Sequence, residues 1–146
     1  MKQILSAIFV LITILTAAGQ TIKPTDIVGT WETETKTSKM QIFQSGNSYE
    51  GKLTWGIKIM ESDGKTFKKD VNNPDATLRS RSVENIVFIQ GLVWDDDEWT
   101  DGTIYDPTSG KTYKCKAEIE DGKLYVRGYI GVPAFGKTAV YDRINQ

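Results

Sequence analysis

The stretch Tyr113–Ile130, YKCKAEIEDGKLYVRGYI, decides the fold class, because its turn and its alternating side chains indicate the same hairpin. Asp121-Gly122 is typical of a two-residue type I′ turn. With this loop, every opposed pair on one face is apolar or small: Ile119 with Leu124, Ala117 with Val126, Cys115 with Gly128, and Tyr113 with Ile130. Pairing shifted by one residue would instead bury Lys114, Lys116 and Glu118. We therefore predict an antiparallel hairpin in this register.

A second hairpin is predicted around Gly46-Asn47. As a two-residue loop, this dipeptide creates two further apolar or small pairs: Ile42 with Gly51, and Met40 with Leu53. Apolar or small residues then occupy the odd positions of residues 49–59, and most of the even positions are polar. This period of two predicts a long strand with one buried face, and the face includes Trp55.

The rest of the chain contains further strand signals and no helical periodicity of useful length. The other expected strands span residues 29–35, 83–94, 99–105 and 136–143. Most connections are short, but residues 61–82 form a long segment in which Asp75 can cap a helical turn that extends to Arg81. The sequence therefore predicts an all-β fold. We expect an antiparallel up-and-down barrel of about eight strands, with one long loop or short helix between early strands.

The two ends of the barrel sequence suggest how it closes. Gly29-Thr30-Trp31 opens the first strand, and Arg143 lies in the last. A guanidinium placed over an indole ring stabilises a fold by about 0.5–2 kcal/mol. We therefore expect structural roles for Gly29, Trp31 and Arg143 at the closed end of the barrel.

The N-terminus has the pattern of a secretory signal peptide. Lys2 precedes an apolar run from Ile4 to Leu15, and small residues follow it. Cleavage after Ala18 or after Gly19 fits equally well. We expect residues 1–19 to be a cleaved signal and residues 20–146 to form one β-barrel domain without a transmembrane segment. No Cys for lipid attachment follows the apolar run, so the expected location is the periplasm or the exterior.

Composition argues against several classes of function. The chain has no His and a single Cys, Cys115, which removes His-based triads and the His-bearing zinc and iron sites. Without Lys2, 17 basic residues face 19 acidic ones, a net charge of −2 that does not suit a nucleic-acid partner. We expect no cofactor, no metal and no catalytic motif, which makes an enzyme the less favoured interpretation.

The strongest candidate site is the segment from Asp70 to Arg81. Its side chains can act as oxygen ligands or as forked donors to a carboxylate or phosphate: Asp70, Asn72, Asn73, Asp75, Arg79 and Arg81. The same residues can equally satisfy their own backbone, with Asx turns, a cap at Asp75 and arginines paired to Asp70 or Asp75.

Aromatic residues provide a second candidate site. Trp31, Tyr49, Trp55 and Tyr113 all fall on faces predicted to point inward. Such rings can form the wall of an apolar ligand pocket, and Trp55 and Tyr113 are the candidates for ligand contact. They can equally fill the barrel, and the sequence leaves both alternatives open.

Several motifs in order resemble those of the DUF2147 family of exported bacterial proteins of unknown function. They span most of the mature chain: Asp70 to Asp75, Arg79 to Arg81, Trp99, Gly102 to Pro107, Ser109 to Tyr113, Arg127 to Gly131, and Phe135 to Thr138. The resemblance implies a lipocalin-like barrel but no established activity. More loosely, the Gly29-Thr30-Trp31 motif with Arg143 is similar to the calycin pattern of lipocalins and fatty-acid-binding proteins.

Three functions are compatible with these observations. The favoured one is non-enzymatic binding of a small apolar or amphipathic ligand at the barrel mouth, with the segment from Asp70 to Arg81 at its rim. The second is a filled barrel that acts through its surface as an envelope or stress-related interaction module. The third is an enzyme that uses Asp70 or Asp75 as an acid or base beside Arg79. The ligand and the oligomeric state remain open.

Overall fold

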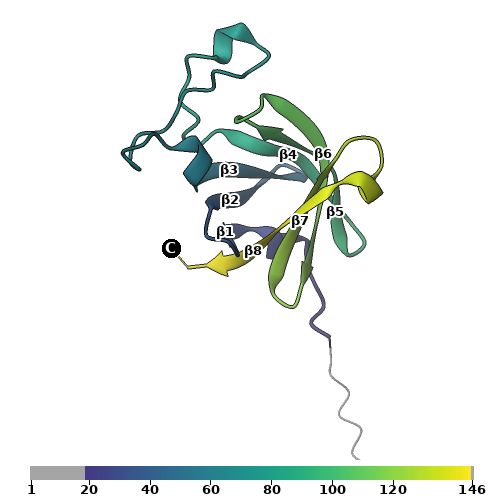
Figure 1. The fold of residues 1–146 in the computed structure, drawn as a ribbon. Coiled ribbons are helices and arrows are strands. Elements are labelled where there is room, and N and C mark those ends of the chain that lie inside the picture. The colour runs from purple at the N-terminus through teal and green to yellow at the C-terminus, as the bar shows by residue number, and fades with distance from the viewer. Residues whose placement is uncertain (1–18, 146) are drawn as a thin grey trace, which may run out of the picture.

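Eight antiparallel strands form a closed barrel in the computed structural model, which describes residues 19–145 (Figure 1). The strands are β1 (Gly29–Thr33), β2 (Ser38–Ser45), β3 (Ser48–Gly56), β4 (Val87–Asp95), β5 (Glu98–Asp106), β6 (Lys111–Glu120), β7 (Lys123–Tyr129) and β8 (Lys137–Ile144). Each strand pairs with its neighbours in sequence, and β8 pairs with β1, so no sheet edge is left open. The predicted all-β, up-and-down barrel is confirmed. The predicted signal peptide lies outside the described residues except for Gly19.

The connections define two ends of the barrel. We call "the mouth" the end that carries the β1–β2, β3–β4, β5–β6 and β7–β8 connections, and "the closed end" the opposite one. Within residues 19–145, four short 3-10 turns lie outside the strands: η1 (Pro24–Ile27), η2 (Ile57–Ile59), η3 (Ala76–Leu78) and η4 (Pro133–Phe135). The β3–β4 connection is by far the longest, and Figure 1 shows it standing out from the barrel beyond β3 and β4. Among residues 19–145, no helix is long and apolar enough to cross a membrane.

Both predicted hairpin registers are confirmed. Ala117 pairs with Val126 and Ile119 with Leu124, around a turn in which Asp121 and Gly122 have φ of 51° and 77°. These positive values are those of a type I′ turn, which matches the twist of the strands. The expected pair of Tyr113 with Ile130 does not form, because β7 ends at Tyr129 and the chain turns away.

The predicted inward position of Trp55 is wrong, because β3 contains an irregularity that the alternation did not reveal. Met40 pairs with Leu53 but Lys39 pairs with Trp55, so Thr54 is an extra residue in β3. An extra residue reverses the direction of the side chains that follow it. Trp55 therefore faces outward and is half-buried, and the ammonium of Lys39 lies 5.9 Å from the centre of its ring.

The closed end is held together as predicted for Trp31 and Arg143. The guanidinium carbon of Arg143 lies 4.2 Å from the centre of the Trp31 ring. Arg143 also donates to the backbone carbonyls of Val28 (2.8 Å) and Asp26. Gly29, with φ of 144°, lies directly under this guanidinium, where a Cβ atom would collide with it. A Trp, an Arg and a Gly thus join the first strand to the last.

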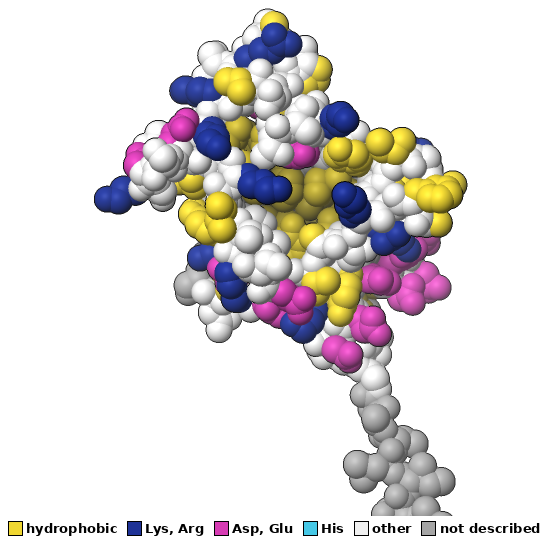
Figure 2. All heavy atoms as spheres, viewed as in Figure 1, with side chains coloured by type: hydrophobic (Ala, Val, Ile, Leu, Met, Phe, Trp, Pro, Cys, Tyr) yellow, Lys and Arg dark blue, Asp and Glu magenta, His cyan; other side chains and the backbone are white. Residues whose placement is uncertain are grey.

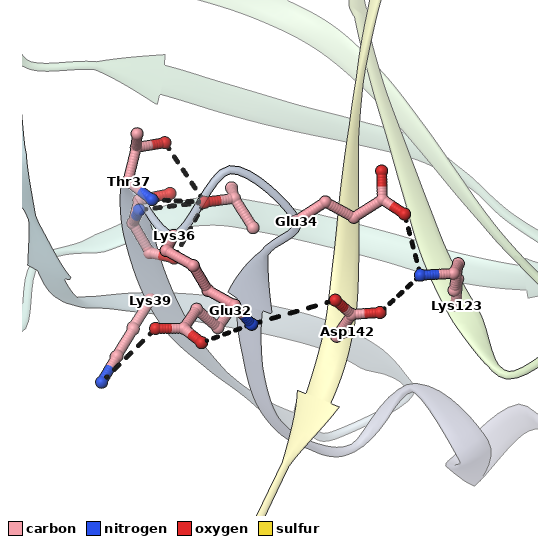
Figure 3. Close-up of polar contacts among 9 residues, drawn as sticks. Glu32, Glu34, Lys36, Thr37, Lys39, Lys123 and Asp142 are labelled. Carbon is pink, nitrogen blue, oxygen red and sulfur yellow. Dashed lines mark hydrogen bonds and ion pairs between the residues drawn. The ribbon is translucent and has the colours of Figure 1, made fainter.

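An ion-pair network fastens the β1–β2 turn to the wall beside it (Figure 3). Lys123 on β7 binds Glu34 at 2.8 Å and Asp142 on β8 at 2.6 Å. Lys36 binds Glu32 at 2.9 Å and lies 3.9 Å from Asp142. These contacts lower the pKa of the Glu32 and Asp142 carboxyls and raise the pKa of both ammonium groups. The seam between β1 and β8 is therefore charged outside and aromatic inside.

Side chains fill the closed half of the barrel. Trp31 and Trp99 are fully buried there, and each indole N–H donates to a carbonyl of η1, to Ile27 at 2.8 Å and to Pro24 at 3.1 Å. Apolar residues from all parts of the sheet complete this core: Met40, Ile42, Tyr49, Ile89, Leu92, Cys115, Ala117 and Leu124. The filled half thus accounts for two of the aromatic residues, Trp31 and Tyr49, that were predicted inside.

Candidate functional site

The mouth half of the barrel contains a cavity of about 730 Å³. Its volume lies within the range of about 300–1,000 Å³ that is typical of ligand pockets. The deeper wall is apolar or aromatic: Leu53, Phe88, Ile104, Tyr113, Val126 and Tyr141. Figure 2 shows this hollow as a yellow depression with several basic side chains around it. The interior is therefore filled at one end and open at the other.

The rim of the cavity is polar on two sides. Lys58 lies just beyond β3, and Lys137 begins β8; neither ammonium forms an ion pair with a described residue. Asp106, at the end of β5, accepts hydrogen bonds from Thr108 and Ser109. Burial by itself would raise the pKa of the Asp106 carboxyl, but these hydrogen bonds outweigh it and the pKa is lowered. The rim thus offers the ammonium groups of Lys58 and Lys137 to a ligand, whereas the Asp106 carboxylate already accepts hydrogen bonds from the β5–β6 turn.

Beside the cavity, a buried carboxylate fixes the long β3–β4 connection to β5. Asp70 is 0% exposed and accepts hydrogen bonds from Asn73 Nδ2 at 2.8 Å and Tyr105 Oη at 2.5 Å. Arg81 binds the same carboxylate through Nε at 3.0 Å and Nη2 at 2.9 Å. Burial and the bond to Asp70 raise the pKa of Tyr105, whose ring lines the cavity, to about 12. This network therefore positions one side of the rim.

The remaining predicted residues of this segment also bind protein atoms. Arg79 Nε donates to the carbonyl of Asn73 at 2.7 Å, and Asp75 caps η3 by accepting from the backbone N–H of Thr77 at 2.9 Å. Asn72 Nδ2 donates to the carbonyl of Thr108 at 2.9 Å, which ties the segment to the β5–β6 turn. The structure thus brings together the predicted residues from Asp70 to Arg81. Their side chains form hydrogen bonds with protein atoms, mostly within the segment itself.

The predicted site residues occupy three different environments. Tyr113 lines the cavity. The six residues from Asp70 to Arg81 lie in the adjoining segment, and none of them lines the cavity. Trp55 lies outside the barrel, where it lines a smaller pocket with Met60 and Lys68. The cavity and the polar segment are therefore neighbours that meet at Tyr105.

Sequence reasoning missed several residues of the cavity. Lys58 was expected to point outward from a continuous strand, but β3 ends at Gly56 and η2 follows. Phe88 and Tyr105 lie in strands whose registers could not be derived from a turn. Phe135 lies in the β7–β8 connection and Lys137 is the first residue of β8, and only the topology brings this part of the chain to the mouth. The signal that could have found them is the position of each connection in an up-and-down barrel.

The described residues offer few groups suited to covalent chemistry. Cys115 is fully buried among apolar side chains, and burial raises the pKa of its thiol to about 12. Within the part of the chain that the structure describes, no cluster of three or more His, Cys, Asp or Glu side chains could hold a metal ion. Asp70 and Asp75, the carboxylates considered for acid–base catalysis, do not line the cavity. The site's geometry is that of a pocket with a cationic rim.

Comparison with known proteins places this barrel among the lipocalin-like folds. Its structure is similar to that of HP1028 from Helicobacter pylori, which is described as belonging to the lipocalin family. The TM-score is 0.68, the sequences are 26% identical, and the match covers 82% of this chain and 83% of HP1028. No curated protein sequence is significantly similar to the chain.

The sequence itself identifies the family. Residues 29–143 match the model of the DUF2147 family, which is described as an uncharacterized protein conserved in bacteria. The match covers all eight strands except the last residue of β8. The chain belongs to this family. It folds as a lipocalin-like barrel, as the resemblance of its motifs implied.

Proposed function

We propose that this protein binds a small apolar or amphipathic ligand in the cavity at the mouth. The observation that supports this function most directly is the cavity of about 730 Å³, with an apolar wall and a polar rim. Burial of apolar ligand surface in such a wall contributes about 25 cal/mol per Å². The cavity favours this function over a barrel filled by side chains throughout.

The residues of the site divide into contacting and positioning groups in this proposal. Tyr113 contacts the ligand from the wall, and Lys58 and Lys137 face its polar end at the rim. The segment from Asp70 to Arg81 acts indirectly, since its bonds to Tyr105 and to the β5–β6 turn hold the rim in place. This gives Arg79 and Arg81 a different role from the direct contact with a carboxylate or phosphate that the sequence left open.

A filled-cavity variant tests the proposal. Ala139 on β8 lines the cavity and pairs with the inward residue Val126, so Ala139→Trp should occupy the space of the ligand. The matched control is Val140→Trp on the same strand, because Val140 lies on the outer face, where it pairs with Tyr125. Native mass spectrometry of gently purified protein should find a co-purified small molecule on the unaltered chain and on the control. The Ala139→Trp variant should carry little or none.

Two results would overturn this function. One is a ligand that remains bound to the Ala139→Trp variant as well as to the control. The other is the absence of binding by the unaltered chain to any of a panel of fluorescent fatty acids, acyl esters and aromatic dyes, when their displacement is measured at micromolar concentration. Circular dichroism of all three chains verifies that the barrel is intact.

We also propose that the protein acts after export, in the periplasm or outside the cell. The support is the N-terminal pattern of a basic residue, an apolar run and small residues that ends at Ala18 or Gly19. Cell fractionation followed by the intact mass of the recovered protein tests this. A mass that starts at Gly19 or Gln20 in the exported fraction is expected, and full-length protein in the cytoplasmic fraction would refute it.

A further inference from the structure

The β7–β8 connection exposes an unusual amount of apolar surface. Ile130 is 71% exposed, Val132 51% and Phe135 85%, all within six residues of the chain. We call these three residues "the apolar tip". The other large exposed hydrophobic residues of the described chain are distributed singly over other segments: Val28, Ile57, Val71 and Val93. Figure 2 shows hydrophobic side chains gathered where Figure 1 places η4 and the connection around it. Exposed apolar groups that cluster in this way mark interaction surfaces.

The backbone that carries the apolar tip is held in place. Arg127 on β7 donates to the carbonyls of Pro133 at 2.6 Å and Ala134 at 3.3 Å, and to Thr138 Oγ1 at 2.8 Å. Gly136 packs so closely that a Cβ atom there would lie 2.6 Å from the carbonyl oxygen of Gly128. The tip is therefore a preorganised surface, and its side chains point to solvent from a fixed scaffold.

Charge around the apolar tip is positive. The mouth halves of β6, β7 and β8 carry Lys111, Lys114, Arg127 and Lys137 and no acidic residue. By contrast, the connections at the closed end carry Asp96, Asp97 and Asp121, with Asp95, Glu98 and Glu120 beside them. The strand ends around the apolar tip are thus basic, whereas the β4–β5 and β6–β7 connections at the opposite end are mainly acidic.

We propose that the apolar tip docks onto an anionic lipid surface and inserts shallowly into it. Apolar side chains on a fixed support gain free energy by leaving water at the lipid interface, and nearby basic side chains are attracted to anionic head groups. The acidic closed end is repelled by the same surface, which fixes the orientation of the barrel. Since Ile130 and Phe135 also line the cavity, docking places the mouth against the lipid. This goes beyond ligand binding and does not depend on the identity of the ligand.

Co-sedimentation with vesicles tests this docking. The protein is residues 20–146, which include the complete closed barrel and leave out the apolar N-terminal run. The vesicles contain phosphatidylcholine and phosphatidylglycerol in a ratio of 3:1, or phosphatidylcholine alone. We expect binding to the anionic vesicles, weaker binding to the neutral ones, and a decrease as salt is raised. The affinity of the double variant Ile130→Ser/Phe135→Ser for anionic vesicles should be at least about tenfold lower than that of the unaltered chain.

A matched variant separates the apolar tip from general hydrophobicity. Ile57→Ser/Val71→Ser removes two side chains of similar exposure, 57% and 62%, that lie outside the tip. It should bind the anionic vesicles as the unaltered chain does. Urea unfolding of both variants checks that neither has lost the fold. Ala139→Trp, which fills the cavity, should leave vesicle binding unchanged, so docking and ligand binding can fail separately.

Three results would overturn the docking proposal. The unaltered chain could stay in the supernatant with anionic vesicles, in which case the apolar tip would fit a protein partner instead. The two double variants could lose vesicle binding to the same extent, which would remove the special role of the tip. The chain could also bind neutral and anionic vesicles equally at all salt concentrations, which would contradict the charge argument.

Discussion

At the scale of single residues, Asp70 organises the side of the rim formed by β5. Its carboxylate receives three hydrogen bonds, from the side chains of Asn73, Arg81 and Tyr105, and a further ion-pair contact from Arg81 Nη2. It is shielded completely from solvent. A buried carboxylate is tolerated only when it is paired and hydrogen-bonded in this way. Asp70, one of the two carboxylates considered for acid–base catalysis, is thus explained by its position as the anchor of the long connection.

Asp70→Asn should destabilise the barrel by about 2–3 kcal/mol, because it removes the charge that Arg81 binds and gives Tyr105 a weaker acceptor. The free energy of unfolding in urea measures the effect. Asp75→Asn is the matched control in the same segment, and it should change stability little because Asn is also a good cap. Equal losses in the two variants would show that Asp70 is not the anchor.

Tyr105 makes the same network sensitive to alkaline pH. Its pKa is raised to about 12, so the neutral phenol that donates to Asp70 is favoured in the folded state. The stabilisation is complete below the ordinary pKa of about 10 and is lost as the pH rises through about 12. The unfolding free energy should therefore fall between pH 10 and 12, and it should fall less in Tyr105→Phe. Tyr125→Phe, on the outer face of β7, should keep the full decrease.

The residues of the Asp70 network within the long connection could be identified from the sequence, but the geometry of the network could not. Pairing among residues 70–81 was one of the two alternatives that the sequence left open, because Asx and Arg side chains at short spacing have local partners. The bond from Tyr105 to Asp70 spans 35 positions. A contact over that distance depends on how far the long connection folds back, and no local pattern encodes this.

At the scale of elements, the strands were predictable wherever a turn fixed their register. Asp121-Gly122 and Gly46-Asn47 each determined a hairpin, and the structure has both. Trp55 was misplaced because a single extra residue in β3 reverses the faces after Leu53, and an extra residue leaves no mark on a short alternating pattern. Connections and irregularities, rather than the strands themselves, were the unpredictable part.

The ion pairs at the seam of β1, β8 and β7 make the barrel sensitive to acid. Lys123 lowers the pKa of the Asp142 carboxyl, so this pair stabilises the fold above the ordinary Asp pKa of about 4. That stabilisation is lost as the pH falls through the lowered value. Urea midpoints should therefore drop from pH 6 to pH 3, and the drop should be smaller in Lys123→Gln than in the unaltered chain.

Lys65→Gln provides the control for this seam, because Lys65 lies in the long connection and its ammonium forms no ion pair with a described residue. It should show the full drop between pH 6 and pH 3. Addition of 0.5 M salt should reduce the difference between Lys123→Gln and the unaltered chain, since salt screens exposed pairs.

At the scale of the whole molecule, the barrel has a packed half and a hollow half. Local stability follows packing, so amide hydrogen exchange should differ along the barrel axis. Backbone amides of Met40–Ile42, in the filled half, should exchange at least about tenfold more slowly than those of Lys111–Tyr113 at the mouth. Exchange measured by NMR or mass spectrometry on residues 20–146 tests this. Uniform protection would indicate that the mouth is as tightly packed as the closed end.

The burial of Cys115 has a practical consequence. The single thiol of the chain is enclosed in the packed half, and its pKa of about 12 leaves almost no thiolate at neutral pH. We therefore expect the folded protein not to react with maleimides and not to cross-link through air oxidation. A cysteine introduced at an exposed position such as Thr108 would be the only one to react. Fluorophores and spin labels can thus be attached at the rim without removing the native thiol.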